Sequence, residues 1–187
     1  MHAQFSKQAS QIIFLIALTT ALLATIPAKA GSPPPTVIVV RHAEKVDDTR
    51  DPVLNEAGAE RAEALAGALE HAGIDAAYAS QYQRTRLTAL PAAVDAGLSV
   101  RIAPIEGDID AWALGFAAEI AQKHAGETVL VAGHSNTVPP LVAALCRCTV
   151  EALTDSDYDR LYIVSGAGGE HPGVVVARYG EASEQPD

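Results

Sequence analysis

Residues 36–45 read Thr-Val-Ile-Val-Val-Arg-His-Ala-Glu-Lys, a run of β-branched residues followed at once by a polar segment. A short apolar run without alternation is typical of a strand that is buried on both faces, as in a parallel sheet. Residues 128–132 repeat the pattern and run into the polar turn His134-Ser135-Asn136. The sequence therefore predicts two buried central strands, each with chemically active side chains directly after its end.

Strand and helix patterns alternate along the rest of the chain. Asn55 is expected to cap a helix that reaches about residue 71, and a helix over 83–96 is expected to be interrupted or kinked at Pro91. Further strands are expected over 75–79, 99–103, 161–165 and 174–179, and further helices over 110–123 and 136–146. This alternation predicts a three-layer α/β/α sandwich over residues 36–180 with a mostly parallel sheet, the last two strands forming an antiparallel pair near one edge.

The first thirty residues have the pattern of a signal peptide rather than of a domain. Lys7 precedes an apolar run over 12–26, and Ala28-Lys29-Ala30 has the small residues that signal peptidase recognises. The run is shorter than the ~20 residues that span a bilayer, which favours cleavage after Ala30 over a retained anchor. We expect a periplasmic or secreted protein with no stable membrane insertion, a Pro-rich linker over 31–35 and a flexible tail over 181–187.

The charge balance limits the partners of the mature chain. The formal charge is −10, and it becomes −12 when residues 1–30, whose only charges are Lys7 and Lys29, are removed. Such a charge disfavours nucleic acid and anionic membranes as partners. An anionic substrate must therefore be bound by a local cationic pocket.

Cys146 and Cys148 are the only cysteines. In an oxidising compartment they either form a small ring or remain two inert thiols. Their C-x-C spacing differs from the C-x-x-C of redox sites, and no histidine lies nearby at the spacing of a zinc ligand.

Four polar clusters are expected at the carboxyl ends of the strands, where α/β sheets bind ligands. They are Arg41-His42, residues 80–84, residues 106–110 and residues 134–136. A neutral His42 can attack phosphorus, and Arg41 can donate two hydrogen bonds to an oxyanion. Arg84 and His134 are expected to face the same anion, together with the N–H groups of the helix that follows residue 136.

Four segments of the chain resemble, in order, the motifs of the histidine phosphatase, or phosphoglycerate mutase-like, superfamily. Residues 41–45 resemble its R-H-G/A signature, and residues 54–62 its L-[T/N]-x-x-G-x-x-[Q/R]-A helix start. Residues 80–85 resemble S-x-x-x-R-[A/T], and residues 133–135 resemble G-H-[S/G]. Long lid insertions are absent, so the chain is most similar to small members, which include bacterial phosphohistidine phosphatases.

The resemblance implies a metal-independent phosphomonoester hydrolase that needs no cofactor and acts on a small phosphorylated substrate. His42 would become phosphorylated, and Arg41, Arg84 and His134, with Ser135 beside it, would bind the phosphoryl group. A carboxyl group would protonate the leaving oxygen and activate water. Glu106 is the first choice for this acid and Asp108 the second, whereas Asp110 is a plausible helix cap. The sequence specifies neither the physiological substrate nor the oligomeric state.

Two other interpretations remain open. The turn around Ser135, between a strand and a helix, resembles the nucleophile elbow of an α/β-hydrolase esterase, and an aspartate among 155, 157 and 159 and then His171 follow in order. The short chain, the lack of a Gly-rich oxyanion segment and the unused Arg41 and Arg84 count against an esterase. A non-catalytic phosphoanion-binding protein is the other alternative.

Overall fold

The structure, a computed structural model, describes residues 31–183. Its elements are, in chain order, β1 (Thr36–Arg41), α1 (Glu56–Ala68), β2 (Ile74–Ala79), α2 (Gln83–Asp95), β3 (Val100–Ile102), α3 (Ile109–Lys123), β4 (Thr128–Gly133), α4 (Val138–Cys146), β5 (Arg160–Ser165) and β6 (Gly173–Arg178). The predicted signal peptide and residues 184–187 lie outside the described residues. Within 31–183 no helix is both long and apolar enough to cross a membrane.

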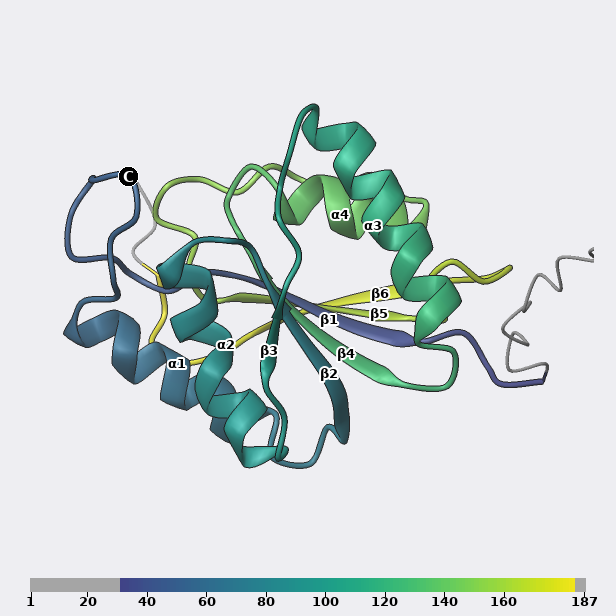
Figure 1. The fold of residues 1–187 in the computed structure, drawn as a ribbon, viewed down its shortest axis with the longest axis horizontal. Helices are drawn as coiled ribbons and strands as arrows, with labels where there is room; N and C mark the ends of the chain where they lie inside the picture. Colours follow the sequence, from purple (N-terminus) through teal and green to yellow (C-terminus); the bar gives the residue numbers. More distant parts are fainter. Residues whose placement is uncertain (1–30, 184–187) are drawn as a thin grey trace, which may run out of the picture.

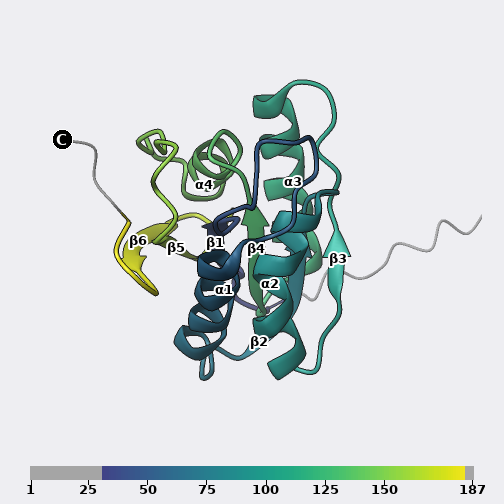
Figure 2. The same ribbon diagram turned by 90° about the vertical axis from the view of Figure 1, so that its left-hand side faces the viewer.

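The six strands form one mixed sheet in the order β3-β2-β4-β1-β5-β6 (Figure 2). The neighbours β3, β2, β4 and β1 run parallel, and β5 and β6 continue the sheet as an antiparallel pair at one edge. Helices α3 and α4 cover one face of the sheet, and α1 and α2 cover the other (Figure 1). The predicted three-layer sandwich and its antiparallel edge pair are confirmed.

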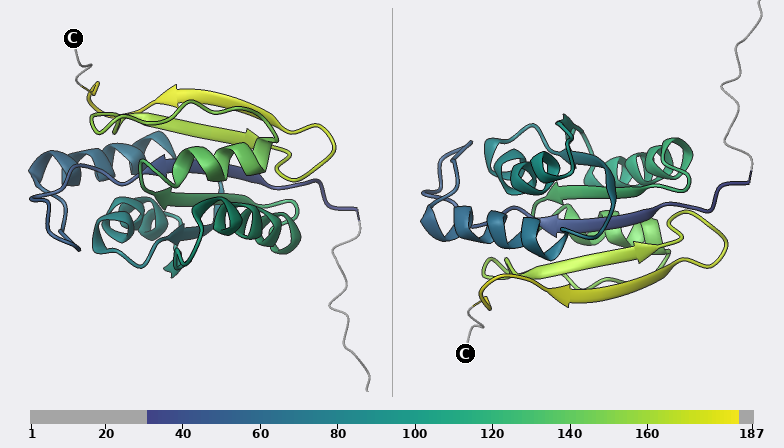
Figure 3. Two further views of the ribbon diagram at one scale, coloured as in Figure 1. Left: turned by 90° about the horizontal axis from the view of Figure 1, so that it is seen from above. Right: turned by 90° about the horizontal axis from the view of Figure 1, so that it is seen from below.

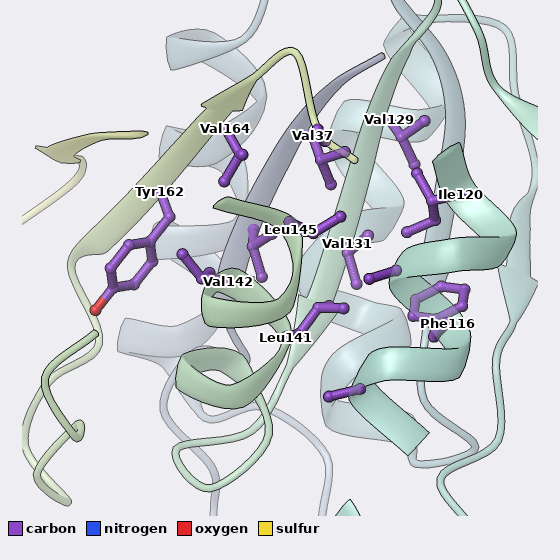
Figure 4. Close-up of a cluster of buried hydrophobic side chains, with 14 of the residues drawn as sticks. Val37, Phe116, Ile120, Val129, Val131, Leu141, Val142, Leu145, Tyr162 and Val164 are labelled. Carbon is purple, nitrogen blue, oxygen red and sulfur yellow. The ribbon is translucent and has the colours of Figure 1, made fainter. Parts of the chain in front are cut away.

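The β-branched run of β1 supplies side chains to both hydrophobic layers. Val37 and Val39 pack toward α3 and α4, in the cluster shown in Figure 4, whereas Ile38 and Val40 pack toward α1 and α2. Successive strand residues point to opposite faces, so a strand between two helical layers needs apolar residues at every position. This requirement explains why residues 37–40 show no polar alternation.

The register of the parallel strands places their ends at one edge of the sheet. Arg41 pairs with Gly133, and Ala79 pairs with Ala132. His42 extends the ladder by donating its N–H to the Gly133 carbonyl at 2.8 Å. The residues that follow β1, β2 and β4 therefore emerge side by side, as the sequence predicts.

Several local expectations differ from the structure. Helix α1 ends at Ala68 rather than near residue 71, and α2 runs through Pro91 without interruption. Asp108, and not Asp110, caps α3, since its carboxylate accepts the Ala111 N–H at 2.9 Å. Helix α4 begins at Val138 instead of residue 136.

A disulfide lies at the end of α4, and the first residues of the predicted tail contact the domain. Cys146 and Cys148 form a disulfide at the end of α4, the first of the two expected alternatives. Residues 181–183, which the sequence assigns to the tail, hydrogen-bond to the domain: Arg61 donates to the Glu181 carbonyl, and the Ser183 hydroxyl accepts the N–H groups of Tyr158 and Asp159.

Two glycines of α1 differ in the space around them, which provides a matched test of the packing. A methyl group on Gly58 would overlap the backbone carbonyl of Glu44, whereas one on Gly67 would meet nothing within 4 Å. We expect Gly58→Ala to lower the free energy of unfolding by about 1–3 kcal/mol, because the segment after His42 must shift. Gly67→Ala should raise it by about 0.5–1 kcal/mol, since alanine favours a helix more than glycine.

The free energies of unfolding of both variants can be measured by urea denaturation. Stabilisation of similar size by the two substitutions would contradict the close contact between Gly58 and Glu44.

Candidate functional site

A cavity of about 380 Å³ opens at the edge of the sheet where β1, β2 and β4 end. Its lining residues are Arg41, His42, Lys45, Gln81, Tyr82, Arg84, Ile105, His134, Ser135, Asn136, Thr137 and Asp155. Five residues predicted from the sequence, namely Arg41, His42, Arg84, His134 and Ser135, are among them. Segments far apart in the chain thus build one pocket.

His42 is buried, and one hydrogen bond fixes which of its ring nitrogens carries the proton. Its side chain is buried, and Nδ1 lies 2.8 Å from the carbonyl oxygen of Ala43, which can only accept a hydrogen bond. Nδ1 therefore carries the proton, and in the neutral ring Nε2 holds the lone pair. Burial lowers the pKa of His42 to about 4. The charges of Arg41, Arg84 and Lys45 act in the same direction, and the hydrogen bond to Ala43 opposes the shift. At pH 7 the imidazole is neutral, as attack on phosphorus requires.

Arg41 is fixed by the loop that precedes β5. Its Nη1 donates to the carbonyl oxygens of Thr154 at 2.8 Å, Asp155 at 3.0 Å and Asp157 at 3.3 Å. The guanidinium carbon lies 4.0 Å from the centre of the Tyr158 ring. One end of the guanidinium is thereby held by protein, and the stacking on Tyr158 sets its plane.

Arg84 approaches the pocket from the first turn of α2. Its Nη1 donates to the Arg50 carbonyl and its Nη2 to Nδ1 of His134, both at 3.3 Å. Its guanidinium carbon lies 4.5 Å from the centre of the Tyr82 ring. Arg84 thus points back toward the strand ends, as the sequence predicts for a residue that binds an anion there.

Both arginines keep a donor without a partner. Among the buried side-chain nitrogens of residues 31–183, only Nε of Arg41 and Nε of Arg84 have no hydrogen-bond partner. A buried N–H group without a partner is costly, and more so when it is charged. An oxyanion in the cavity would satisfy this kind of donor, since guanidinium groups bind carboxylate and phosphate with short, strong hydrogen bonds.

His134 faces His42 across the pocket, with 5.3 Å between the ring centres. Its backbone N–H donates to the Thr137 hydroxyl at 2.9 Å, and its Nε2 lies 2.8 Å from the Ser80 hydroxyl. Burial, reinforced by the neighbouring His42, Arg84 and Arg41, lowers the pKa of His134 to about 3. The imidazole is therefore neutral in this arrangement.

The expectation that the N–H groups of the following helix would bind phosphate is wrong. The N–H groups of Thr137 and Val138 both donate to the His134 carbonyl. The next two residues of α4, Pro139 and Pro140, have no N–H group to offer. The cationic character of the pocket therefore comes from the side chains of Arg41, Arg84 and Lys45.

The carboxylates that the sequence predicts as the leaving-group acid lie outside the pocket lining. Glu106 is exposed and lies outside the pocket lining, next to the lining residue Ile105, and its role as the acid stays a prediction. Asp108 is engaged in capping α3. Asp155 is the only carboxylate that lines the pocket in the part of the chain that the structure describes.

Sequence analysis missed several residues around the pocket. Tyr82 and Tyr158, which stack on the arginines, and Ser80 and Thr85, which lie behind His134, had no assigned role. Ser80 and Thr85 belong to the S-x-x-x-R-[A/T] motif, so their position could have been noted. Tyr158 lies in a loop whose path only the fold determines.

The esterase arrangement is not assembled. Strand β5 runs antiparallel to β1, with Leu161 opposite Val40 and Val164 opposite Val37. The β5–β6 hairpin that carries His171 therefore lies at the end of the sheet where β1 begins, opposite to Ser135 (Figure 3).

One family model and several solved structures match this chain. Residues 37–110 match the family model of the histidine phosphatase superfamily, branch 1. No curated protein matches the chain significantly in sequence. The matched segment contains Arg41, His42 and Arg84, whereas His134 lies beyond it.

Solved structures with low sequence identity share the fold. A mycobacterial glucosyl-3-phosphoglycerate phosphatase in complex with inorganic phosphate is 18% identical with a TM-score of 0.61, covering 76% of this chain and 95% of that chain. The protein histidine phosphatase SixA complexed with tungstate is 19% identical with a TM-score of 0.58, covering 76% and 96%. YhfR from Bacillus stearothermophilus is 22% identical with a TM-score of 0.60, covering 80% and 98%.

The chain shares its fold with these structures, and its pocket is lined by residues from segments 41–45, 80–85 and 133–135. Residues 31–183 contain no group of three or more His, Cys, Asp or Glu side chains placed to hold a metal ion. The family-model match over residues 37–110 and the fold shared with these structures make the chain similar to the histidine phosphatase superfamily, branch 1.

Proposed function

We propose that this protein hydrolyses phosphomonoesters through a phosphohistidine formed at Nε2 of His42. The observation that carries the proposal is a buried neutral imidazole, with Nδ1 held by the Ala43 carbonyl, in a pocket with two unpartnered arginine donors. The solved relatives with phosphate or tungstate bound support an oxyanion as the ligand of this pocket.

In the first step Nε2 of His42 attacks phosphorus, so that an N–P bond forms and the P–O bond to the leaving group breaks. Arg41 and Arg84 donate to the phosphoryl oxygens and stabilise the charge of the transition state. The leaving oxygen takes a proton from a carboxyl group, for which Glu106 is the first choice, and departs as an alcohol. In the second step the resulting carboxylate takes a proton from the attacking water, the N–P bond breaks, and phosphate and neutral His42 are released.

The substrate class that fits is a small phosphorylated molecule. The cavity of about 380 Å³ is lined mainly by polar and charged side chains, and Tyr82 is the aromatic residue in its lining. Export of the protein and its periplasmic location stay predictions.

The nucleophile is tested by hydrolysis of p-nitrophenyl phosphate. We expect turnover that persists in EDTA and falls by about a thousandfold or more in His42→Ala, because the covalent route is lost. Ser135→Ala should retain most of the activity, because Ser135 only lines the pocket. Urea denaturation of both variants controls for folding.

An inverted pattern, with activity retained in His42→Ala and lost in Ser135→Ala, would instead support a serine esterase. Phosphate binding without turnover in the unmodified protein would leave the phosphoanion-binding alternative.

The role of Arg84 is tested by a change that keeps the charge. Arg84→Lys replaces a planar donor group by an ammonium that cannot contact His134 and the oxyanion with the same geometry. We expect kcat/KM to fall by about 10²–10³-fold, mostly in kcat, because transition-state donors are lost.

Arg86→Lys, an exposed position two residues further along α2, serves as the matched control and should change kcat/KM by less than about twofold. Equal effects of the two substitutions would contradict a phosphoryl contact for Arg84.

A further inference from the structure

Behind His134, two buried hydroxyl groups form a hydrogen-bond chain whose direction can be assigned. Thr85 Oγ1 lies 2.8 Å from the Tyr82 carbonyl oxygen, which can only accept, so Thr85 donates to it. The hydroxyls of Ser80 and Thr85 are also 2.8 Å apart. Because the Thr85 proton is already engaged, Ser80 is the donor of this second hydrogen bond.

This direction fixes the proton position of His134. Nε2 of the imidazole lies 2.8 Å from the Ser80 hydroxyl, whose own proton points to Thr85. Nε2 must therefore carry a proton and donate it to Ser80. In the neutral ring Nδ1 then holds the lone pair, and it accepts from Arg84 Nη2 at 3.3 Å. The two site histidines are thus opposite tautomers, since His42 carries its proton on Nδ1.

The lone pair of His134 conflicts with a fully ionised oxyanion. Such an anion presents only acceptors, and a phosphoryl oxygen beside Nδ1 would face a second acceptor unless a proton lies between them. A proton on Nδ1 removes the conflict, and the bound anion offsets the cationic charges that otherwise keep the ring neutral.

The groups that face His134 come from several elements. Arg84 and Tyr82 lie at the start of α2, Arg41 and His42 at the end of β1, and Lys45 and Asp155 on surrounding loops. Most of the charge is cationic, so only an arriving anion makes protonation of His134 favourable.

We propose that Ser80 and Thr85 are positioning residues that hold His134 as the Nε2–H tautomer, so that the pocket takes up one proton with each fully ionised oxyanion. The inference rests on the proposed oxyanion site but not on turnover. For a phosphomonoester, the need for a proton beside Nδ1 of His134 favours binding of the monoanion, or of the dianion together with a proton. The affinity of the pocket for the phosphomonoester therefore decreases as pH rises.

Sulfate is a suitable probe, because it stays fully ionised near neutral pH and brings no proton. Its binding to the full chain can be measured by titration calorimetry in buffers of different ionisation enthalpy, between about pH 5.5 and 7.5. We expect uptake of about one proton per sulfate and an affinity that falls about tenfold per pH unit. Binding without proton uptake, or no binding of sulfate in this range, would overturn the proposal.

Variants of the hydroxyl chain separate positioning from a merely structural role. In Ser80→Ala the neutral His134 ring is able to move its proton to Nδ1. The proton uptake per bound sulfate should therefore fall toward zero, and the pH dependence of the sulfate affinity should flatten. Ser80→Thr keeps a hydroxyl and should retain the uptake, as should Ser99→Ala, an exposed serine outside the pocket. Unchanged uptake in Ser80→Ala would overturn the proposal.

A second pair of variants locates the proton if Ser80→Ala does not fold. His134→Asn should abolish the uptake, whereas His42→Ala should retain it. The opposite result would place the proton on His42 and overturn the proposal. Retained uptake in a protein without phosphatase activity would refute only the proposed function, so the two failures are distinguishable.

Discussion

The pairing of β1 with β4 in parallel, with Arg41 opposite Gly133, is the constraint on which the site depends. The N–H of His42 completes this ladder on the Gly133 carbonyl, so the positions of His42 and His134 are set by backbone hydrogen bonds rather than by loops. Because both strands are buried between two helical layers, a shift by one residue would exchange side chains between the two packed layers and disrupt their packing. The hydrophobic core thereby holds the two imidazoles 5.3 Å apart.

Burial gives the two histidines their chemistry. Both are almost fully enclosed beside Arg41 and Arg84, which lowers the pKa of His42 to about 4 and that of His134 to about 3. The Ala43 carbonyl and the Ser80 hydroxyl then select opposite tautomers. The unprotonated nitrogen is therefore Nε2 in His42 and Nδ1 in His134. The unpartnered Nε atoms of the two arginines supply donors for an oxyanion.

The β-branched runs over 36–40 and 128–132 made the buried strands predictable, because only strands covered on both faces tolerate such runs. The polar residues after them then located most of the pocket. Other features depend on details that no local pattern carries. The start of α4 moved to Val138, where Pro139 and Pro140 remove the expected amide donors, and the loop that anchors Arg41 through Thr154 has no periodicity. The tautomer of His134 requires distances among Ser80, Thr85 and Tyr82.

The proposed mechanism requires that His42 carry the phosphoryl group during turnover. Rapid quenching of the protein with p-nitrophenyl phosphate, followed by peptide mass spectrometry under alkaline conditions, tests it most directly. The account predicts a phosphoryl group on Nε2 of His42 that is lost in mild acid and is absent from His42→Ala. Turnover accompanied by an acid-stable phosphoryl group on Ser135, with His42 unmodified, would contradict it.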